Sequence, residues 1–302
     1  MNTPSNAMQE SQVGIPSAVL SATRPFYWSV RKELWEYRSI YLAPASIAAV
    51  ILLGFVFVLV GLPHTVHSAM AMDPEHQRDA ISHPFEIVAA LIMMAAFIVS
   101  LYYALDTLYG ERRDRSILFW KSLPVSDITT VLAKTFVLLV LLPAISVAIM
   151  GITEAIVLGL SVAVLAAHGL SIAAFWAQLQ PIQSMNGMLY HIVTVHILWY
   201  APLYTWLLLI SAWSKRAPLL WALLPPFAIV VFERVAFHTT YFQTFLRNRF
   251  AGGNDAASNM LDPEMRMHAF RFMVTPGLWF GLLFAAAFLF AAARLRRYRG
   301  PI

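Results

Sequence analysis

Histidine is the residue type in this sequence that is best suited to bind a metal ion or to sense pH. Four histidines crowd one polar stretch between residues 63 and 84: His64, His67, His76 and His83. Imidazoles at this density can bind a transition metal or titrate near neutral pH. Their spacing follows no ligand pattern, and a further pair, His191 and His196, stands at an i, i+5 spacing that places the two rings on different faces of a helix. We therefore assign no metal site. We expect the polar stretch of residues 63–84 to form an outer loop.

Ionisable and polar aromatic residues inside apolar stretches are a second group of candidates. A charged side chain at the centre of a bilayer costs roughly 2.5 to 3.5 kcal/mol on insertion scales, so an ionisable residue within an apolar stretch is a candidate functional residue. Glu154 interrupts a long apolar run, where it either marks the point at which a helix leaves lipid or lines a polar cavity. We select four residues as candidates for contact with a substrate inside the membrane: His196, Tyr200, Tyr204 and Glu154.

Motifs for catalysis by this chain alone are absent from the sequence. No lysine follows a glycine, as the nucleotide-binding loop G-x-x-x-x-G-K-[ST] requires, and neither H-E-x-x-H nor G-x-S-x-G occurs. Cysteine is also absent, which excludes thiolate nucleophiles, disulfides and cysteine-based metal centres. We expect the chain not to be an enzyme and to carry no cofactor of its own.

The composition indicates that lipid covers much of the outer surface. Of the 302 residues, 59% are hydrophobic and only 12% are charged, whereas about a quarter of a soluble domain is charged. Apolar runs of on the order of 20 residues can cross the hydrocarbon layer as helices, and we assign six: about 42–62, 87–109, 129–153, 185–213, 217–237 and 272–293. The third continues outward to residue 167, either as an overlong helix or as a re-entrant segment. The expected fold is an all-α polytopic membrane protein with six transmembrane helices.

The basic residues set the expected orientation. With six spans and a cytoplasmic N-terminus, 15 of the 21 Lys and Arg residues lie inside and 6 lie outside. This asymmetry follows the positive-inside rule and predicts that both termini are cytoplasmic. The net charge of +5 is then explained by the membrane, and we expect no nucleic-acid partner.

The segment before the first span divides into two parts. Residues 1–22 have a composition typical of disorder, and residues 23–302 form the membrane domain. From Thr23 onward, apolar residues recur on one helix face, opposite Lys32, Glu33 and Glu36. Such a helix is expected to lie flat in the inner membrane interface. The alternative is that these residues add cytoplasmic turns to the first span.

The loop between the second and third spans has the most specific pattern. It reads GERRDRSILFWKSLPVSD from Gly110 to Asp127, and Gly110 permits a break after the span. Asp114 can cap a short helix that stops at Leu123, because the residue before a proline avoids helical geometry. Ser126 can then cap the third span. The pattern predicts a short helix on the cytoplasmic side between two chain breaks.

The short helix carries more apolar surface than the membrane interface can cover. Phe119, Trp120 and Leu123 share one face, while Ile117 and Leu118 lie partly on another. A protein partner is therefore expected on this helix. The arginines of the loop, taken singly, also fit positive charge at lipid headgroups.

This loop resembles the first cytoplasmic loop of bacterial ATP-binding-cassette permeases of the type-2 exporter family. The order of an interfacial helix, six spans and a long last outer loop is similar as well. The resemblance implies a multi-pass permease subunit of the cell inner membrane. Its short helix would be a coupling helix, seated in a cleft of a separate ATPase subunit that binds ATP and Mg. It also implies a second permease chain, identical or different. ATPase coupling would then fall to eight residues: Glu111, Arg112, Arg113, Asp114, Arg115, Phe119, Trp120 and Lys121.

Two other functions remain open at this point. One is a membrane scaffold or sensor that works with an ATPase but transports nothing. The other is a polytopic, metal-dependent membrane enzyme that uses the outer histidines or Glu154.

Overall fold

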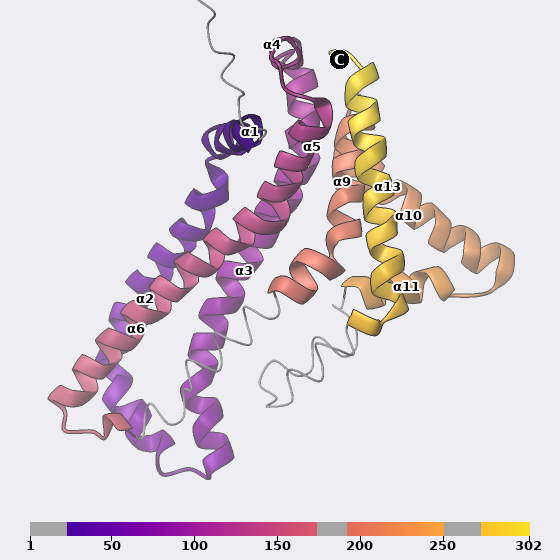
Figure 1. Ribbon diagram of the computed structural model, residues 1–302. Coiled ribbons are helices and arrows are strands. Elements are labelled where there is room, and N and C mark those ends of the chain that lie inside the picture. The colour runs from indigo at the N-terminus through magenta and orange to yellow at the C-terminus, as the bar shows by residue number, and fades with distance from the viewer. Residues whose placement is uncertain (1–22, 174–191, 251–272) are drawn as a thin grey trace, which may run out of the picture.

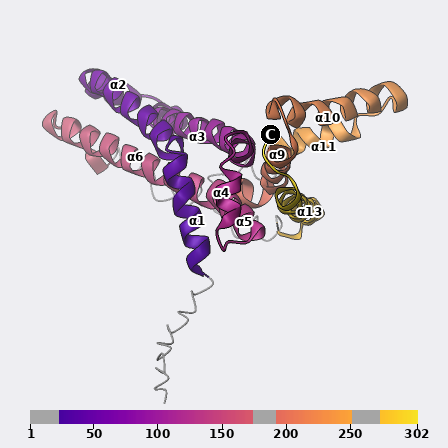
Figure 2. The ribbon, with the colours of Figure 1, turned by 90° about the horizontal axis from the view of Figure 1, so that it is seen from above.

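The computed structural model describes residues 23–173, 192–250 and 273–302, and all regular structure within these ranges is helical (Figure 1). Residues 1–22, which we expected to be disordered, lie outside the described ranges. Helices α2, α3 and α6 extend together to one side, and α10 and α11 extend to the other (Figure 2). Helices α1 and α4 and the C-terminus lie at one end of the molecule, which we call the α4 end (Figure 1).

Five helical stretches are long and apolar enough to cross a membrane: Ser39–Ala69, Ile87–Arg113, Asp127–Ala167, Pro218–Phe237 and Pro276–Tyr298. They correspond to the first, second, third, fifth and sixth expected spans. The fourth expected span, 185–213, begins in residues that are not described. Its described part consists of a π-helical segment, η2 (Ile192–Trp199), and α9 (Ala201–Trp213), and α9 by itself is shorter than a full span.

Three of the helices are much longer than a bilayer requires. Helix α2 is Ser39–Ala69, α3 is Pro74–Arg113, and α5 (Asp127–Phe136), η1 (Val137–Leu141) and α6 (Leu142–Ala167) form one continuous stretch. At 1.5 Å per residue a helix of 40 residues is about 60 Å long, about twice the hydrocarbon thickness. Residues 154–167 therefore continue the third helical stretch without a break.

The expected outer loop 63–84 is instead a helical hairpin formed by the end of α2 and the start of α3. The reason is tertiary packing. Val66 and Ala69 of α2 are buried against Leu165 of α6, and Leu62 and Phe85 pack around them. This apolar contact stabilises helical turns in a segment whose polar sequence does not predict a helix.

The remaining helices meet around a central core. Tyr103 of α3, Leu138 of η1, Tyr204 and Leu208 of α9, and Ala292 of α13 (Pro276–Tyr298) are all buried in one cluster. Helix α10 (Pro218–Phe232) differs, because Ala222 is its one buried residue in the described structure. It continues into η3 (Glu233–Phe237) and is followed by α11 (Tyr241–Phe250). The apolar surface of α10 is thus available to lipid or to another chain.

Helix α1 (Thr23–Glu36) runs across the α4 end and leaves the line of α2 at a bend after Glu36 (Figure 2). The sequence pattern predicts that its charged residues face outward, but two of them do not. Glu33 is 1% exposed, and Lys32 is largely covered. Trp28 and Trp35 face outward instead. These buried charges are paired with charges on other helices, so the sequence of α1 alone does not predict their burial.

Candidate functional site

The predicted short helix is present as α4 (Ile117–Ser122), but its start differs from the prediction. Gly110 causes no break, because α3 continues to Arg113 and Asp114 follows as its C-terminal flanking residue. The chain turns at Arg115, whose φ of 60° lies in the left-handed region. Asp114 therefore does not cap α4. The break falls where a positively charged side chain projects from the turn.

The end of α4 agrees with the local sequence signals. Leu123, before Pro124, is extended, with ψ of 151°. The Oγ of Ser126 accepts a hydrogen bond from the backbone N–H of Thr129 at 3.0 Å, and α5 begins at the next residue, Asp127. This is the expected N-terminal cap. Helix α4 is thus joined to α5 by only a few residues.

The apolar residues of α4 divide differently from the predicted faces. Ile117 is buried, and Trp120 is half-buried. Leu118 and Phe119 are 60% and 61% exposed, and Leu123 is also exposed. The exposed apolar surface is therefore centred on Leu118 and Phe119, and Trp120 belongs mainly to the inner side.

Two side chains hold α4 against other helices. The indole of Trp120 covers the ammonium of Lys32 on α1, with the nitrogen 4.0 Å from the ring centroid. The Nζ of Lys121 donates hydrogen bonds to the carbonyls of Arg297 and Arg299, at 3.2 and 3.1 Å. These are carbonyls at the C-terminal end of α13, where a cation is favourable. Helix α4 is therefore attached to α1 on one side and to α13 on the other.

Behind α4 lies a group of paired charges that we call the ionic cluster. Its members come from four helices: Lys32 and Glu33 of α1, Glu111 of α3, Asp127 and Lys134 of α5, and Arg296 of α13. Three carboxylates face three cations. Because the formal charges balance, the group can be buried together.

Glu111 is the centre of this cluster. Its Oε1 lies 2.8 Å from the Nζ of Lys32 and 3.0 Å from the Nζ of Lys134, and its Oε2 accepts from Nη2 of Arg296 at 3.1 Å. Arg296 also binds Asp127 at the start of α5. Glu111 is 2% exposed. One carboxylate therefore connects α3 with α1, α5 and α13.

Glu33 is the second buried carboxylate of the cluster. Lys134 donates to its Oε1 at 2.7 Å, while the hydroxyls of Tyr103 and Thr107 donate to its Oε2 at 2.9 and 3.0 Å. Lys134 is fully buried and also donates to the Thr107 hydroxyl at 2.8 Å. Burial lowers the pKa of Lys32, but the charges of Glu33, Glu111 and Glu36 outweigh it and raise that pKa above 10.5. Lys32 is therefore a cation at neutral pH.

Arg112 is turned inward as well. It is 3% exposed, and its Nη1 donates to the carbonyls of Ala212 and Ser214 at 2.6 and 3.1 Å. It thereby satisfies the C-terminal carbonyls of α9. Of the eight residues that the resemblance assigns to coupling, Glu111 and Arg112 face other helices of this chain. Trp120 is half-buried, and the other five are exposed: Arg113, Asp114, Arg115, Phe119 and Lys121.

The substrate candidates on the fourth span lie together. The ring centroids of His196 and Tyr204 are 5.2 Å apart, and Tyr200 lies 6.4 Å from each. His196 and Tyr204 are buried. The Tyr200 hydroxyl donates a hydrogen bond to the carbonyl of Phe250 at 2.9 Å. Glu154 lies outside this aromatic group, half-buried on α6.

Next to this group, Arg249 of α11 is almost completely buried. Its guanidinium carbon lies 4.3 Å from the ring centroid of Trp199, and its Nη1 donates to the Gly277 carbonyl at 3.1 Å. Burial lowers its pKa to about 10. The guanidinium also fills the space beside Gly281, where an added Cβ would lie 1.6 Å from Nη2. Gly281 is therefore required for this arrangement.

The clustered histidines are distributed over the hairpin at the far end, with His64 and His67 on α2 and His76 and His83 on α3. In the described part of the chain, no three His, Asp or Glu residues come close enough together to hold a metal ion.

The sequence alone does not predict the ionic cluster. Lys134 is one of the 15 basic residues expected on the cytoplasmic side, although it lies two turns into the third helical stretch, between Ala133 and Thr135. An ionisable residue at such a position requires a partner. This was the available signal, but it does not say that the partners are Glu33 and Glu111.

No protein-family model, no curated protein and no solved structure matches the chain. The function is therefore inferred from the residues of the α4 end and from the contacts between them.

Proposed function

We propose that this chain is the membrane-spanning permease subunit of an ATP-driven exporter of the ATP-binding-cassette type. It is not itself an enzyme. ATP and Mg bind to a separate cytoplasmic ATPase subunit, and a second permease chain completes the transport path. The observation that carries the proposal is the way α4 is held: it exposes Leu118 and Phe119 while Trp120 and Lys121 attach it to α1 and α13.

The exposed side of α4 suits a protein cleft. Leu118 and Phe119 form an apolar knob, and the exposed Arg113 and Arg115 lie at its base. Aromatic residues and arginines are enriched in protein interfaces. We expect the partner cleft to be apolar inside with acidic residues at its edge, since complementary charge guides association.

The inner side of α4 supports transmission of a movement. A displacement of α4 acts on Lys32 through Trp120 and on the end of α13 through Lys121. Both α1 and α13 are bound to Glu111 of α3, by Lys32 and by Arg296. A partner that moves α4 therefore acts on helices that continue toward the membrane core. In this proposal His196, Tyr200, Tyr204 and Glu154 remain the residues that contact the substrate.

The proposal is tested with a photo-crosslinking amino acid at position 119 of the full-length chain, activated in living cells. The expected product is a covalent adduct with a cytoplasmic ATPase that contains a nucleotide-binding loop. The matched control carries the same amino acid at position 57, because Phe57 of α2 is 82% exposed on a surface expected to face lipid. If position 119 yields the same lipid adducts as position 57 and no protein, α4 is not a coupling helix.

One observation favours a second function, that of a membrane scaffold or sensor driven by an ATPase. The ends of α2, α3 and α6 extend far from the α4 end and have an apolar cluster of their own around Val66, Ala69 and Leu165. Such a stalk is suited to holding an outer protein. ATP-dependent accumulation of a solute in inverted vesicles containing both chains would contradict this alternative.

A further inference from the structure

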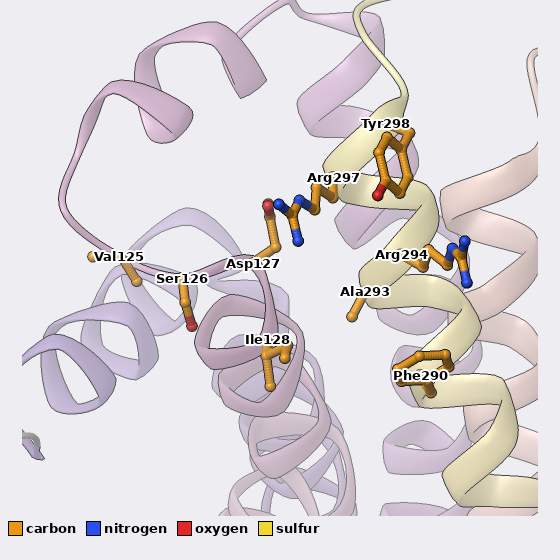
Figure 3. A pocket seen from close by; sticks show the side chains of 9 residues that line it. All are labelled: Val125, Ser126, Asp127, Ile128, Phe290, Ala293, Arg294, Arg297 and Tyr298. Carbon is orange, nitrogen blue, oxygen red and sulfur yellow. The ribbon is translucent and has the colours of Figure 1, made fainter.

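A pocket of about 550 Å³ lies between the start of α5 and the end of α13 at the α4 end (Figure 3). One part of its wall is apolar and is formed by Ile128 and Phe290. The other part is polar and includes Asp127, Arg294, Arg297 and Tyr298. The function proposed above does not use this pocket.

The charge of the pocket is positive. Arg297 points across the pocket toward α5, while Arg294 extends from another side of α13 (Figure 3). Both are exposed, and no ion pair with a carboxylate is found for either in the described part of the chain. Asp127 is the one carboxylate among the described lining residues, and Arg296 already binds it. Arg297 is therefore the cationic group directed across the pocket, and Arg294 adds positive charge from the side of α13 that faces away from α5 (Figure 3).

The apolar and basic residues follow one another along the helix axis. Phe290 precedes Arg294 by about one helical turn, roughly 6 Å, and Arg297 follows by nearly one turn more. Phe290 and Ile128 are 66% and 58% exposed, so the apolar wall is open to its surroundings. The order runs from apolar residues on the membrane side to arginines at the helix end. A phospholipid has the same order, from acyl chain to phosphate.

We propose that this pocket binds an anionic phospholipid of the leaflet on the α4 side. Arg297 contacts the phosphate, and Arg294 adds positive charge at the rim. The acyl chain lies along Phe290 and Ile128. The start of α5 adds the positive end of a helix dipole at the same place. A lipid bound here touches both helices that the Arg296–Asp127 pair joins.

The experiment measures lipid binding to the purified full-length chain by native mass spectrometry. Phosphatidylglycerol and phosphatidylcholine with identical acyl chains are titrated separately, and inorganic phosphate is added in a third series. The variants are R297Q and R216Q. Arg216 is also an exposed basic residue of the same predicted side, but it does not line the pocket, so R216Q controls for the loss of one charge.

The expected result is a preference of the wild-type chain for phosphatidylglycerol of about tenfold or more, since basic residues at a membrane surface attract anionic lipids. R297Q should lose most of this preference, and R216Q should keep it. Equal behaviour of R297Q and R216Q would show general charge attraction and would overturn the proposal. Displacement of phosphatidylglycerol by an equal concentration of inorganic phosphate would also overturn it, because the site would then recognise the free anion.

Discussion

The ammonium of Lys32 lies over the ring of Trp120, 4.0 Å from its centroid, while the same nitrogen is 2.8 Å from Oε1 of Glu111. One side chain thus contacts the short helix at the surface and the buried carboxylate behind it. A cation over an aromatic ring contributes on the order of 0.5 to 2 kcal/mol, with the larger value for a desolvated pair. This contact connects α4 directly with the ionic cluster.

Removal of the Trp120 ring is expected to uncover Lys32. In W120A, acetylation of Lys32 by an amine-reactive reagent, followed by mass spectrometry, should be several-fold faster than in the wild type. The matched control is F119A, because Phe119 is exposed and the ring that lies over the Lys32 ammonium is that of Trp120. Equal acceleration in both variants would mean that the ring of Trp120 does not cover the ammonium.

Loss of the buried ammonium of Lys134 is expected to be strongly destabilising. K134M leaves Glu33 and Glu111 with one cation fewer in a buried site, and breaking a buried ion pair typically costs about 3 to 5 kcal/mol. The double variant K134M/E33Q, which restores the charge balance, should recover part of the loss. Thermal unfolding of the detergent-purified chain measures both. A double variant no more stable than K134M would contradict the charge-balance explanation.

The contribution of Lys32 to stability is expected to be independent of pH across the neutral range. Its pKa is raised above the ordinary value of 10.5, so its stabilising effect is complete below that value and is lost only as pH rises through the higher folded-state pKa. K32Q should therefore lower the free energy of unfolding by the same amount at pH 6 and at pH 9. A loss confined to pH 6 would show that Lys32 is neutral at pH 9.

The exposed knob of α4 is expected to serve association and to contribute little to folding. L118D/F119D should unfold at nearly the wild-type temperature, because both side chains are about 60% exposed, but it should no longer co-purify with the ATPase. S122D is the control, since it adds negative charge to the same helix and removes no apolar surface. Retained co-purification of L118D/F119D would contradict the docking surface proposed here.

Two glycines of α13 are expected to respond oppositely to alanine. G281A places a Cβ where the Arg249 guanidinium lies and should destabilise by about 1 to 3 kcal/mol. G277A meets only ordinary contacts, the nearest with Trp199 at 3.8 Å, and should be neutral or slightly stabilising in a helix. Adding R249A to G281A should reduce the cost of G281A, as measured by a double-mutant cycle. Equal stability of the two single variants would mean that the Arg249 guanidinium does not occupy the space beside Gly281.

The sequence by itself determined the features that depend on local physics. Long apolar runs predict spanning helices wherever they occur, because the hydrocarbon layer leaves the backbone no other partner. Five such stretches are present in the described residues. The Leu123–Pro124 stop and the Ser126 cap are likewise properties of neighbouring residues, and both are found.

Only the tertiary structure decided which faces are buried. Glu33 and Glu111 read as polar surface in their own segments, yet they are buried because Lys134 and Arg296 approach from distant parts of the chain. The stretch 63–84 reads as a loop, yet it is helical because it packs on α6. In each case the stabilising partner is remote in sequence, and a pattern within one segment carries no information about charge balance or packing supplied by another.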